Sequence, residues 1–187
     1  MAAVSHHLDF DDLQRLREER TERLELIDGE LFVTPSPSML HQLVSKRLNR
    51  ILLQAVDDAG IGAFFYAPLD VKLGPRDVVQ PDLVVVLKGH FTVFTDAAIA
   101  GSPDLAVEIV SSTTGRTDRV IKRDRYAQFG VPEYWLIDPE ARQITIHADP
   151  REGHYQIART FTDTAVSTII PDLTVDVAAL LSPVPEE

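Results

Sequence analysis

Two short apolar segments of the chain each carry a single carboxylate. Asp82 precedes the β-branched run at residues 83–87, and Glu108 lies within a similar run at residues 105–110. Runs of this kind are typical of strands that are covered on both faces. Because an ionised carboxylate among apolar neighbours is costly unless something binds it, we expect Asp82 and Glu108 to share a bound cation.

A lysine near this pair would complete an arrangement that many nucleases use. They place an acidic residue and a lysine at positions i and i+2 of one strand, since these side chains point the same way. Here Val110 stands two residues after Glu108, so the lysine must come from another element. The helix predicted at residues 116–129 offers Lys122, which shares a face with Tyr126. Its long stem would let the ammonium reach the Glu108 strand.

The apolar periodicity and the turn signals predict the elements that position these groups. Asp28-Gly29 is a strong signal for a two-residue hairpin turn, and Gly130 ends the helix that carries Lys122. We predict helices at residues 8–18, 39–57, 116–129 and 175–181, a short helical piece near residue 96, and strands at residues 23–27, 30–34, 63–73, 78–87, 104–110, 133–138, 143–148, 155–161 and 166–170.

This order of elements predicts an α/β (α+β) fold in which helices flank a mixed β-sheet. An N-terminal hairpin precedes the sheet, and further strands follow it. The chain has 187 residues with 44% hydrophobic content, enough for one domain with a full core. We expect a single domain over residues 1–187, with its core at about residues 20–148 and C-terminal strands with a short helix at residues 153–182.

The composition excludes several classes of site. The chain has no cysteine, which rules out disulfides and thiolate metal sites. Its first ten residues lack the pattern of a signal peptide. No apolar run approaches the roughly 20 residues of a membrane helix. We therefore expect a soluble cytoplasmic protein without a membrane partner.

The net charge of −11 disfavours a protein that holds DNA through its overall field alone. Positive charge is nevertheless concentrated in residues 36–54 and 115–125. One interpretation is two solvated helix faces. The other is that both stretches lie on one side of the molecule and contact nucleic acid. Under the second interpretation, the candidate DNA-binding residues are Lys46, Arg47, Arg116, Arg119 and Arg123.

Several segments, taken in order, resemble the Uma2 family of restriction endonucleases, which belongs to the PD-(D/E)XK nuclease superfamily. The resemblance extends over roughly residues 24–138. It is carried by Glu25-Leu26-Ile27-Asp28-Gly29-Glu30, Ser36-Pro37-Ser38-Met39-Leu40-His41-Gln42, Pro81-Asp82, Glu108-Ile109-Val110-Ser111, Lys122 to Tyr126, and Gly130-Val131-Pro132-Glu133-Tyr134-Trp135-Leu136-Ile137-Asp138-Pro139.

The resemblance implies a restriction-endonuclease-like fold and metal-dependent hydrolysis of DNA phosphodiester bonds, performed by a homodimer. Asp82 and Glu108 would hold Mg²⁺ or Mn²⁺ together with water. Lys122 would replace the lysine that is missing at position 110 and would orient the attacking water or stabilise the developing charge. Glu30 and His41 would support the same pocket, Glu30 as a further metal contact and His41 near water or phosphate.

Two other functions remain open on the sequence. The protein could keep a nuclease fold without catalysis and serve as a binding or regulatory partner, an alternative that the acidic charge and the displaced lysine favour. It could also hydrolyse a smaller phosphoester. Each candidate residue has an ordinary structural interpretation as well: a strand-edge acid for Asp82 and Glu108, a solvated helix lysine for Lys122, an exposed hairpin acid for Glu30, and a local hydrogen bond for His41.

Overall fold

The computed structural model describes residues 7–111 and 115–183. Among these residues, no helix combines the length and the apolar character needed to cross a membrane. The helices are α1 (Phe10–Glu19), α2 (Met39–Leu52), α3 (Arg123–Gln128) and α4 (Val177–Leu180), with the π-helical segments η1 (Leu53–Asp58) and η3 (Thr117–Lys122) and the 3-10 helix η2 (Lys88–Val93).

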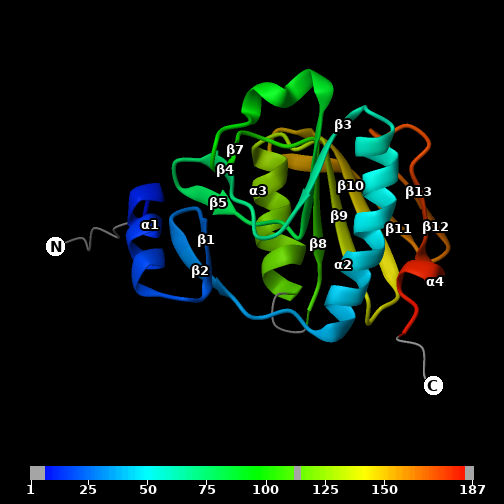
Figure 1. Cartoon of the computed structure of the whole chain (residues 1–187), viewed down its shortest axis with the longest axis horizontal. Helices are drawn as coiled ribbons and strands as arrows, with labels where there is room; N and C mark the ends of the chain where they lie inside the picture. The colour runs from blue at the N-terminus through cyan, green and yellow to red at the C-terminus, as the bar shows by residue number, and fades with distance from the viewer. Residues whose placement is uncertain (1–6, 112–114, 184–187) are drawn as a thin grey trace.

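The strands form two sheets and a small separate ribbon (Figure 1). One sheet has the order β2-β1-β5-β4-β7, the other has the order β11-β10-β9-β8-β6-β3, and β12 pairs with β13. The strands are β1 (Arg23–Ile27), β2 (Glu30–Thr34), β3 (Gly62–Tyr66), β4 (Val71–Gly74), β5 (Asp77–Val79), β6 (Leu83–Leu87), β7 (Ile99–Ala100), β8 (Leu105–Ile109), β9 (Glu133–Asp138), β10 (Gln143–Arg151), β11 (His154–Phe161), β12 (Thr164–Val166) and β13 (Thr174–Asp176).

The sequence predicted one mixed sheet, and the structure has two sheets that are both mixed. In the six-stranded sheet, β8 and β9 run parallel, while the remaining neighbours are antiparallel. In the five-stranded sheet, β4 and β7 are the parallel pair. The α/β fold class expected from the order of elements is therefore confirmed.

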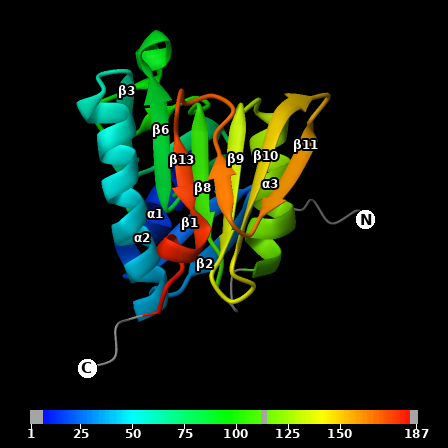
Figure 2. The same cartoon turned by 90° about the vertical axis from the view of Figure 1, so that its right-hand side faces the viewer.

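The elements stack in layers around the six-stranded sheet. One face of this sheet packs against α2, the β12-β13 ribbon and α4, which lie toward the viewer in Figure 2. The opposite face packs against α3 and the five-stranded sheet. Helix α1 covers the outer face of the five-stranded sheet through Leu13 (Figure 1). The space between the two sheets is therefore largely filled by apolar side chains, and a buried polar group there must find a partner.

Two of the predicted strands are each divided between the two sheets. Residues 63–73 form β3 in the large sheet and β4 in the small one, and residues 78–87 form β5 in the small sheet and β6 in the large one. Pro81 lies where the second of these segments changes sheet. Because proline cannot donate a hydrogen bond to a neighbouring strand, strand pairing is interrupted there. As a result, Asp82 lies at the junction of the two sheets.

The hairpin predicted from Asp28-Gly29 is present and is fastened to α3. Both turn residues have positive φ, 52° and 78°, as a two-residue hairpin turn requires. The backbone N–H of Asp28 donates to Asp77 Oδ1 at 2.9 Å. Arg125 of α3 donates to both Asp77 carboxylate oxygens, at 2.8 and 2.5 Å. These bonds fix β1 and β2 against the helix that follows β8.

Two local predictions are wrong, and two predicted helices differ in their form. The helical piece expected near residue 96 lies earlier, at η2 (Lys88–Val93). The strand expected at residues 166–170 is replaced by β12 and β13 on either side of a turn. The helices at 39–57 and 116–129 are present, but each contains a π-helical segment, for which apolar periodicity gives no signal. The serine- and threonine-rich segment 111–115, whose composition predicts a polar loop, falls in part on residues 112–114, outside the described residues.

Candidate active site

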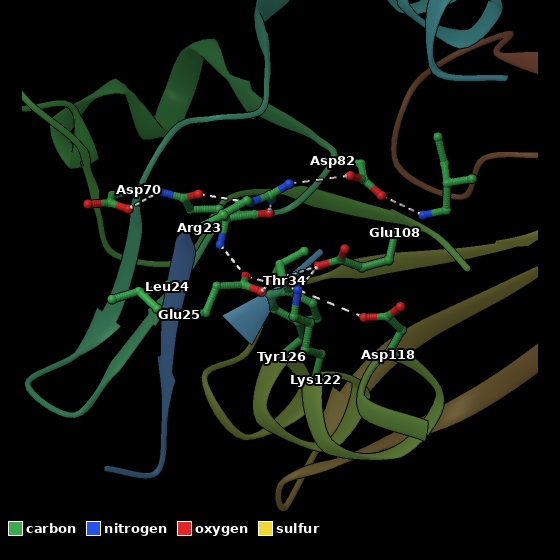
Figure 3. Close-up of polar contacts among 12 residues, drawn as sticks. Arg23, Leu24, Glu25, Thr34, Asp70, Asp82, Glu108, Asp118, Lys122 and Tyr126 are labelled. Carbon is green, nitrogen blue, oxygen red and sulfur yellow. Dashed lines mark hydrogen bonds and ion pairs between the residues drawn. The ribbon is translucent and has the colours of Figure 1, made fainter. Parts of the chain in front are cut away.

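A polar cavity of about 390 Å³ opens where the two sheets and η3 meet. Four buried carboxylates and one buried ammonium lie on its wall (Figure 3). Glu25 comes from β1, Asp82 from the segment before β6, Glu108 from β8, and Asp118 and Lys122 from η3. Residues that are far apart in the sequence are thus brought together by the change of sheet at Asp82.

The pairing of β6 with β8 explains why Asp82 and Glu108 share one side of the sheet. Leu83 lies opposite Val107, so the register places Asp82 across from Glu108, just beyond the paired residues. The backbone N–H of Ile109 donates to Asp82 Oδ2 at 2.8 Å. This bond holds the Asp82 carboxylate beside the Glu108 segment, as the two apolar runs in the sequence suggested.

Lys122 points into the protein and contacts three carboxylates. Its Nζ lies 2.9 Å from Glu25 Oε1, 3.0 Å from Glu108 Oε1 and 3.8 Å from Asp118 Oδ1, and its side chain is only 4% exposed. Burial lowers the pKa of Lys122, but the adjacent carboxylates outweigh burial and raise this pKa above its ordinary value. The ammonium is therefore charged at neutral pH.

The surroundings of Glu108 disfavour the ionised form of its carboxylate. Its Oε1 accepts hydrogen bonds from Lys122 Nζ at 3.0 Å and from the Tyr126 hydroxyl at 2.9 Å. Burial raises the pKa of Glu108 well above its ordinary value; Lys122 opposes this rise, while Asp118, Asp82 and Glu25 add to it. The wall thus carries more negative charge than its cations neutralise.

Asp82 is held in the ionised form. Burial raises its pKa, but the hydrogen bond from His41 and the backbone N–H of Ile109 outweigh burial and leave the pKa below its ordinary value. His41 Nε2 lies 3.0 Å from Asp82 Oδ2, and Arg23 Nη1 lies 3.9 Å from Oδ1. The predicted position of His41 near the acidic pair therefore agrees with the structure.

Glu25 was missed in the reasoning from the sequence, although it contacts Lys122 directly. It also accepts hydrogen bonds from the backbone N–H of Gln80 at 2.6 Å and from Thr34 Oγ1 at 2.8 Å. Burial raises the pKa of Glu25, but Lys122 and Arg23 outweigh burial and lower it. In the sequence, Glu25 lies in the alternating run at residues 23–27, which is the ordinary pattern of a strand with one exposed face and gave no signal.

Glu30 is not brought to this cavity. It is exposed at the start of β2, opposite Ile27, and does not line the cavity wall. Because its strand pairs with β1 at the turn end, its carboxylate lies at the opposite end of the hairpin from Thr34. Among the acidic residues of the hairpin, the structure therefore places Glu25, and not Glu30, beside the catalytic candidates.

The two basic stretches lie on opposite faces of the large sheet, because α2 and α3 cover different faces. Lys46 and Arg116 are exposed. The other three candidates bind within the chain: Arg47 donates to the carbonyls of Leu180 and Ser182, Arg119 pairs with Asp138 at 2.5 Å, and Arg123 pairs with Asp124 at 2.7 Å. Lys46 and Arg116 are therefore the freer cations of the five.

The chemistry of the wall fits a hard divalent cation. In residues 7–111 and 115–183, no three His, Cys, Asp or Glu side chains are arranged as a ligand set. Mg²⁺, however, keeps several of its waters and binds through only one or two carboxylates. Asp82 and Glu108 supply two neighbouring oxygen donors. Burial, and to a smaller extent the nearby carboxylates, raise the pKa of Glu108, and a bound cation would favour its ionised form. These two residues would hold the metal.

Comparison with known proteins connects this geometry to a family. The model of the Uma2 family, described as "Putative restriction endonuclease", matches residues 9–178. This chain belongs to the Uma2 family. The resemblance noted in the sequence is therefore confirmed, and the segments that carry it supply Glu25, Asp82, Glu108 and Lys122 to one cavity.

A solved structure shares the Uma2 fold seen here. It is a crystal structure described as a "putative nuclease belonging to DUF820" from Anabaena variabilis ATCC 29413. It superposes with a TM-score of 0.76 at 20% sequence identity, covering 94% of this chain and 98% of the other. No curated protein matches the chain.

Proposed function

We propose that this Uma2 protein is a divalent-metal-dependent endonuclease that hydrolyses phosphodiester bonds of DNA. The observation that supports the proposal most is the position of the Lys122 ammonium, 3.0 Å from Glu108 Oε1 on the wall that also carries Asp82. This distance supports the proposal that a lysine from the following helix replaces the amine that Val110 does not supply. The family assignment supports a nuclease in general terms.

Each residue of the wall has a distinct proposed role. Asp82 and Glu108 would hold Mg²⁺ or Mn²⁺, which when bound lowers the pKa of a coordinated water and neutralises phosphate charge. Lys122 would donate a hydrogen bond to the attacking water or to a phosphate oxygen that gains charge. Because the adjacent carboxylates keep Lys122 protonated in spite of its burial, it would act as a fixed positive charge and not as a base.

Other residues position these groups. Glu25 and Asp118 hold the Lys122 ammonium from two further sides. The Tyr126 hydroxyl fixes Glu108 Oε1 and leaves the second oxygen of this carboxylate for the metal. His41 and the Ile109 backbone fix Asp82 in the same way.

The substrate would be held by local charge, because the chain as a whole carries −11. Lys46 and Arg116 are exposed candidates for phosphate contacts. A duplex has two strands to cut, so we expect a homodimer in solution. Light scattering after size exclusion would measure the molecular mass and test this expectation.

Nicking of supercoiled plasmid in Mg²⁺ tests the proposed activity. The wild type should convert supercoiled plasmid to open circles, and chelation should stop it. Lys122→Ala should lower the rate by roughly 10²–10³-fold, as for loss of one transition-state donor. Lys88→Ala, at η2 and outside the cavity, is the matched lysine control and should keep the activity. Equal rates for Lys122→Ala and wild type would remove the lysine from the mechanism.

The second candidate is a catalytically silent nuclease fold that binds a partner. One observation favours it: Lys122 already satisfies Glu25 and Glu108 within the chain. No nicking by the wild type with either Mg²⁺ or Mn²⁺, in a protein shown to be folded, would favour this candidate over the nuclease. A panel of small phosphoesters in the same experiment would test the third function considered from the sequence.

A further inference from the structure

A second cavity adjoins the proposed catalytic cavity. Its volume is about 690 Å³, within the roughly 300–1,000 Å³ of pockets that hold small organic ligands. The two cavities share Arg23, Pro37, His41 and Asp82 in their walls. A group bound in the second cavity would therefore lie directly beside the proposed scissile bond.

An exposed aromatic ring lines this second cavity. Tyr66, at the end of β3, is 63% exposed, whereas Tyr126 and Tyr134 are fully buried in the core. The Tyr66 ring has a tilted contact with Phe64, at 6.1 Å between the ring centroids, and most of its surface stays exposed. Exposed aromatic rings beside positive charge are the platforms on which unpaired bases stack.

The positive charge of this cavity is only partly used within the chain. Arg17 is neutralised by Asp70 through two bonds of 2.6 and 2.9 Å. Arg20 is exposed and forms no ion pair with any described residue. Arg23 donates to Gln80 and lies 3.9 Å from Asp82 at the shared wall (Figure 3). Arg20 is thus available to a phosphate, and Arg23 adds positive charge beside it, whereas Glu22 is the exposed acid of the lining.

Polar side chains of α2 form one wall of this cavity. His41, Ser45 and Asn49 follow at i, i+4 and i+8 on one face of the helix and all line the cavity. Asn49 Oδ1 and His41 Nδ1 are buried without a hydrogen-bond partner among the described residues. Buried polar atoms without partners are uncommon in native proteins and cost free energy, so a ligand with hydrogen-bonding edges would satisfy them.

We propose that this cavity is a subsite for one unpaired nucleotide of the DNA, next to the phosphodiester that is cut. The base stacks on Tyr66, its edge faces Asn49, and its phosphate lies between Arg20 and Arg23. A base that stays paired inside a duplex cannot reach the cavity, so the substrate is single-stranded or has an unpaired base at the cut. The inference rests on the proposed nuclease function and restricts its substrate to DNA with an unpaired nucleotide at the cleavage site.

Fluorescence anisotropy without divalent metal tests this subsite independently of catalysis. The probes are a short fluorescein-labelled single-stranded oligodeoxynucleotide and its duplex. Wild type should bind the single strand more tightly. Tyr66→Ala should weaken single-strand binding about tenfold, equal to about 1.4 kcal/mol, and leave duplex binding unchanged. Tyr66→Phe, which keeps the ring, should bind as wild type does, and so should Phe91→Ala, which removes an exposed ring outside the cavity.

Base identity tests the contribution of Asn49. An asparagine amide pairs best with adenine, so oligo(dA) should bind more tightly than oligo(dT), and Asn49→Leu should abolish this difference. Equal affinity of wild type for single strand and duplex, or unchanged single-strand binding by Tyr66→Ala, would overturn the subsite even if the wild type nicks plasmid. Loss of single-strand binding in Tyr66→Ala by a protein that nicks nothing would retain the subsite and reject the nuclease.

Discussion

Replacement of Lys122 by methionine tests whether the buried charge cluster is arranged as described. Methionine keeps the approximate length and the apolar stem of lysine but removes the ammonium. Glu25 and Glu108, at 2.9 and 3.0 Å from Nζ, then lose the cation that both contact. Both carboxylates are buried, so water from the cavity can replace the lost ammonium only in part.

The size of the effect follows from the burial of the pair. Removing one partner of a buried ion pair costs about 3–5 kcal/mol because the other charge stays uncompensated. For a chain of this length, each kcal/mol lowers Tm by about 2–4 °C, so we expect a fall of roughly 6–20 °C. Lys88→Met is the control, and its free energy of unfolding should stay within about 0.5 kcal/mol of the wild type.

The stability difference between Lys122→Met and wild type should also depend on pH, in a direction that follows from the pKa of Glu25. The pKa of Glu25 is lowered from its ordinary value of 4.5, so its contribution to stability is present above pH 4.5 and is lost as the pH falls through the lower folded value. Without Lys122, Glu25 and Glu108 must take up protons to stay buried. The difference between Lys122→Met and wild type should therefore be largest at neutral pH and should shrink toward pH 4.5.

Urea unfolding followed by circular dichroism at several pH values measures this difference. Adding Glu25→Gln to Lys122→Met removes one uncompensated charge and should restore about 0.5–3 kcal/mol, the usual coupling energy of contacting residues. Two results would refute the reasoning: a Lys122→Met protein as stable as wild type at neutral pH, or a difference that grows on acidification.

Three further predictions concern residues outside the charge cluster. Gly29→Ala should cost about 1–2 kcal/mol in thermal unfolding, because φ is 78° there, whereas Gly89→Ala should be nearly neutral. Glu133→Gln should cost about 2–3 kcal/mol and speed amide exchange at Thr168, whose N–H donates to Glu133 at 2.6 Å; unchanged exchange would contradict it. Burial lowers the pKa of His147 from 6.5 to about 4, so its NMR ring signals should titrate near pH 4, and stability should fall from pH 6.5 to 4; titration near 6.5 would contradict this.

Much of the fold could be predicted from local signals. The Asp28-Gly29 turn and the run that forms β9 (Glu133–Asp138) are where the sequence places them. The division of residues 78–87 between two sheets could not be predicted, because alternation of apolar residues tells which face is buried but not which sheet the strand joins. Pro81 marks a break without telling where the chain goes next.

The candidate site shows the same limit. Asp82 and Glu108 could be singled out because a carboxylate in an apolar run is unusual. Lys122 could be inferred only by combining two observations: its position on the buried face of a predicted helix, and the absence of a lysine at position 110. Glu25 could not be found by that reasoning, since an acid in an alternating strand is the ordinary pattern of an exposed face, and only the packing of β1 against η3 buries it.

Calorimetry of Mn²⁺ binding tests the central claim, that Asp82 and Glu108 together hold a divalent cation. The wild type should bind Mn²⁺ with measurable heat, and Lys88→Ala should bind it equally well. Asp82→Asn and Glu108→Gln keep the shape of the side chains but remove the charge, and both should lose the binding heat while remaining folded. Absence of binding by the wild type, or undiminished binding by both variants, would contradict the account.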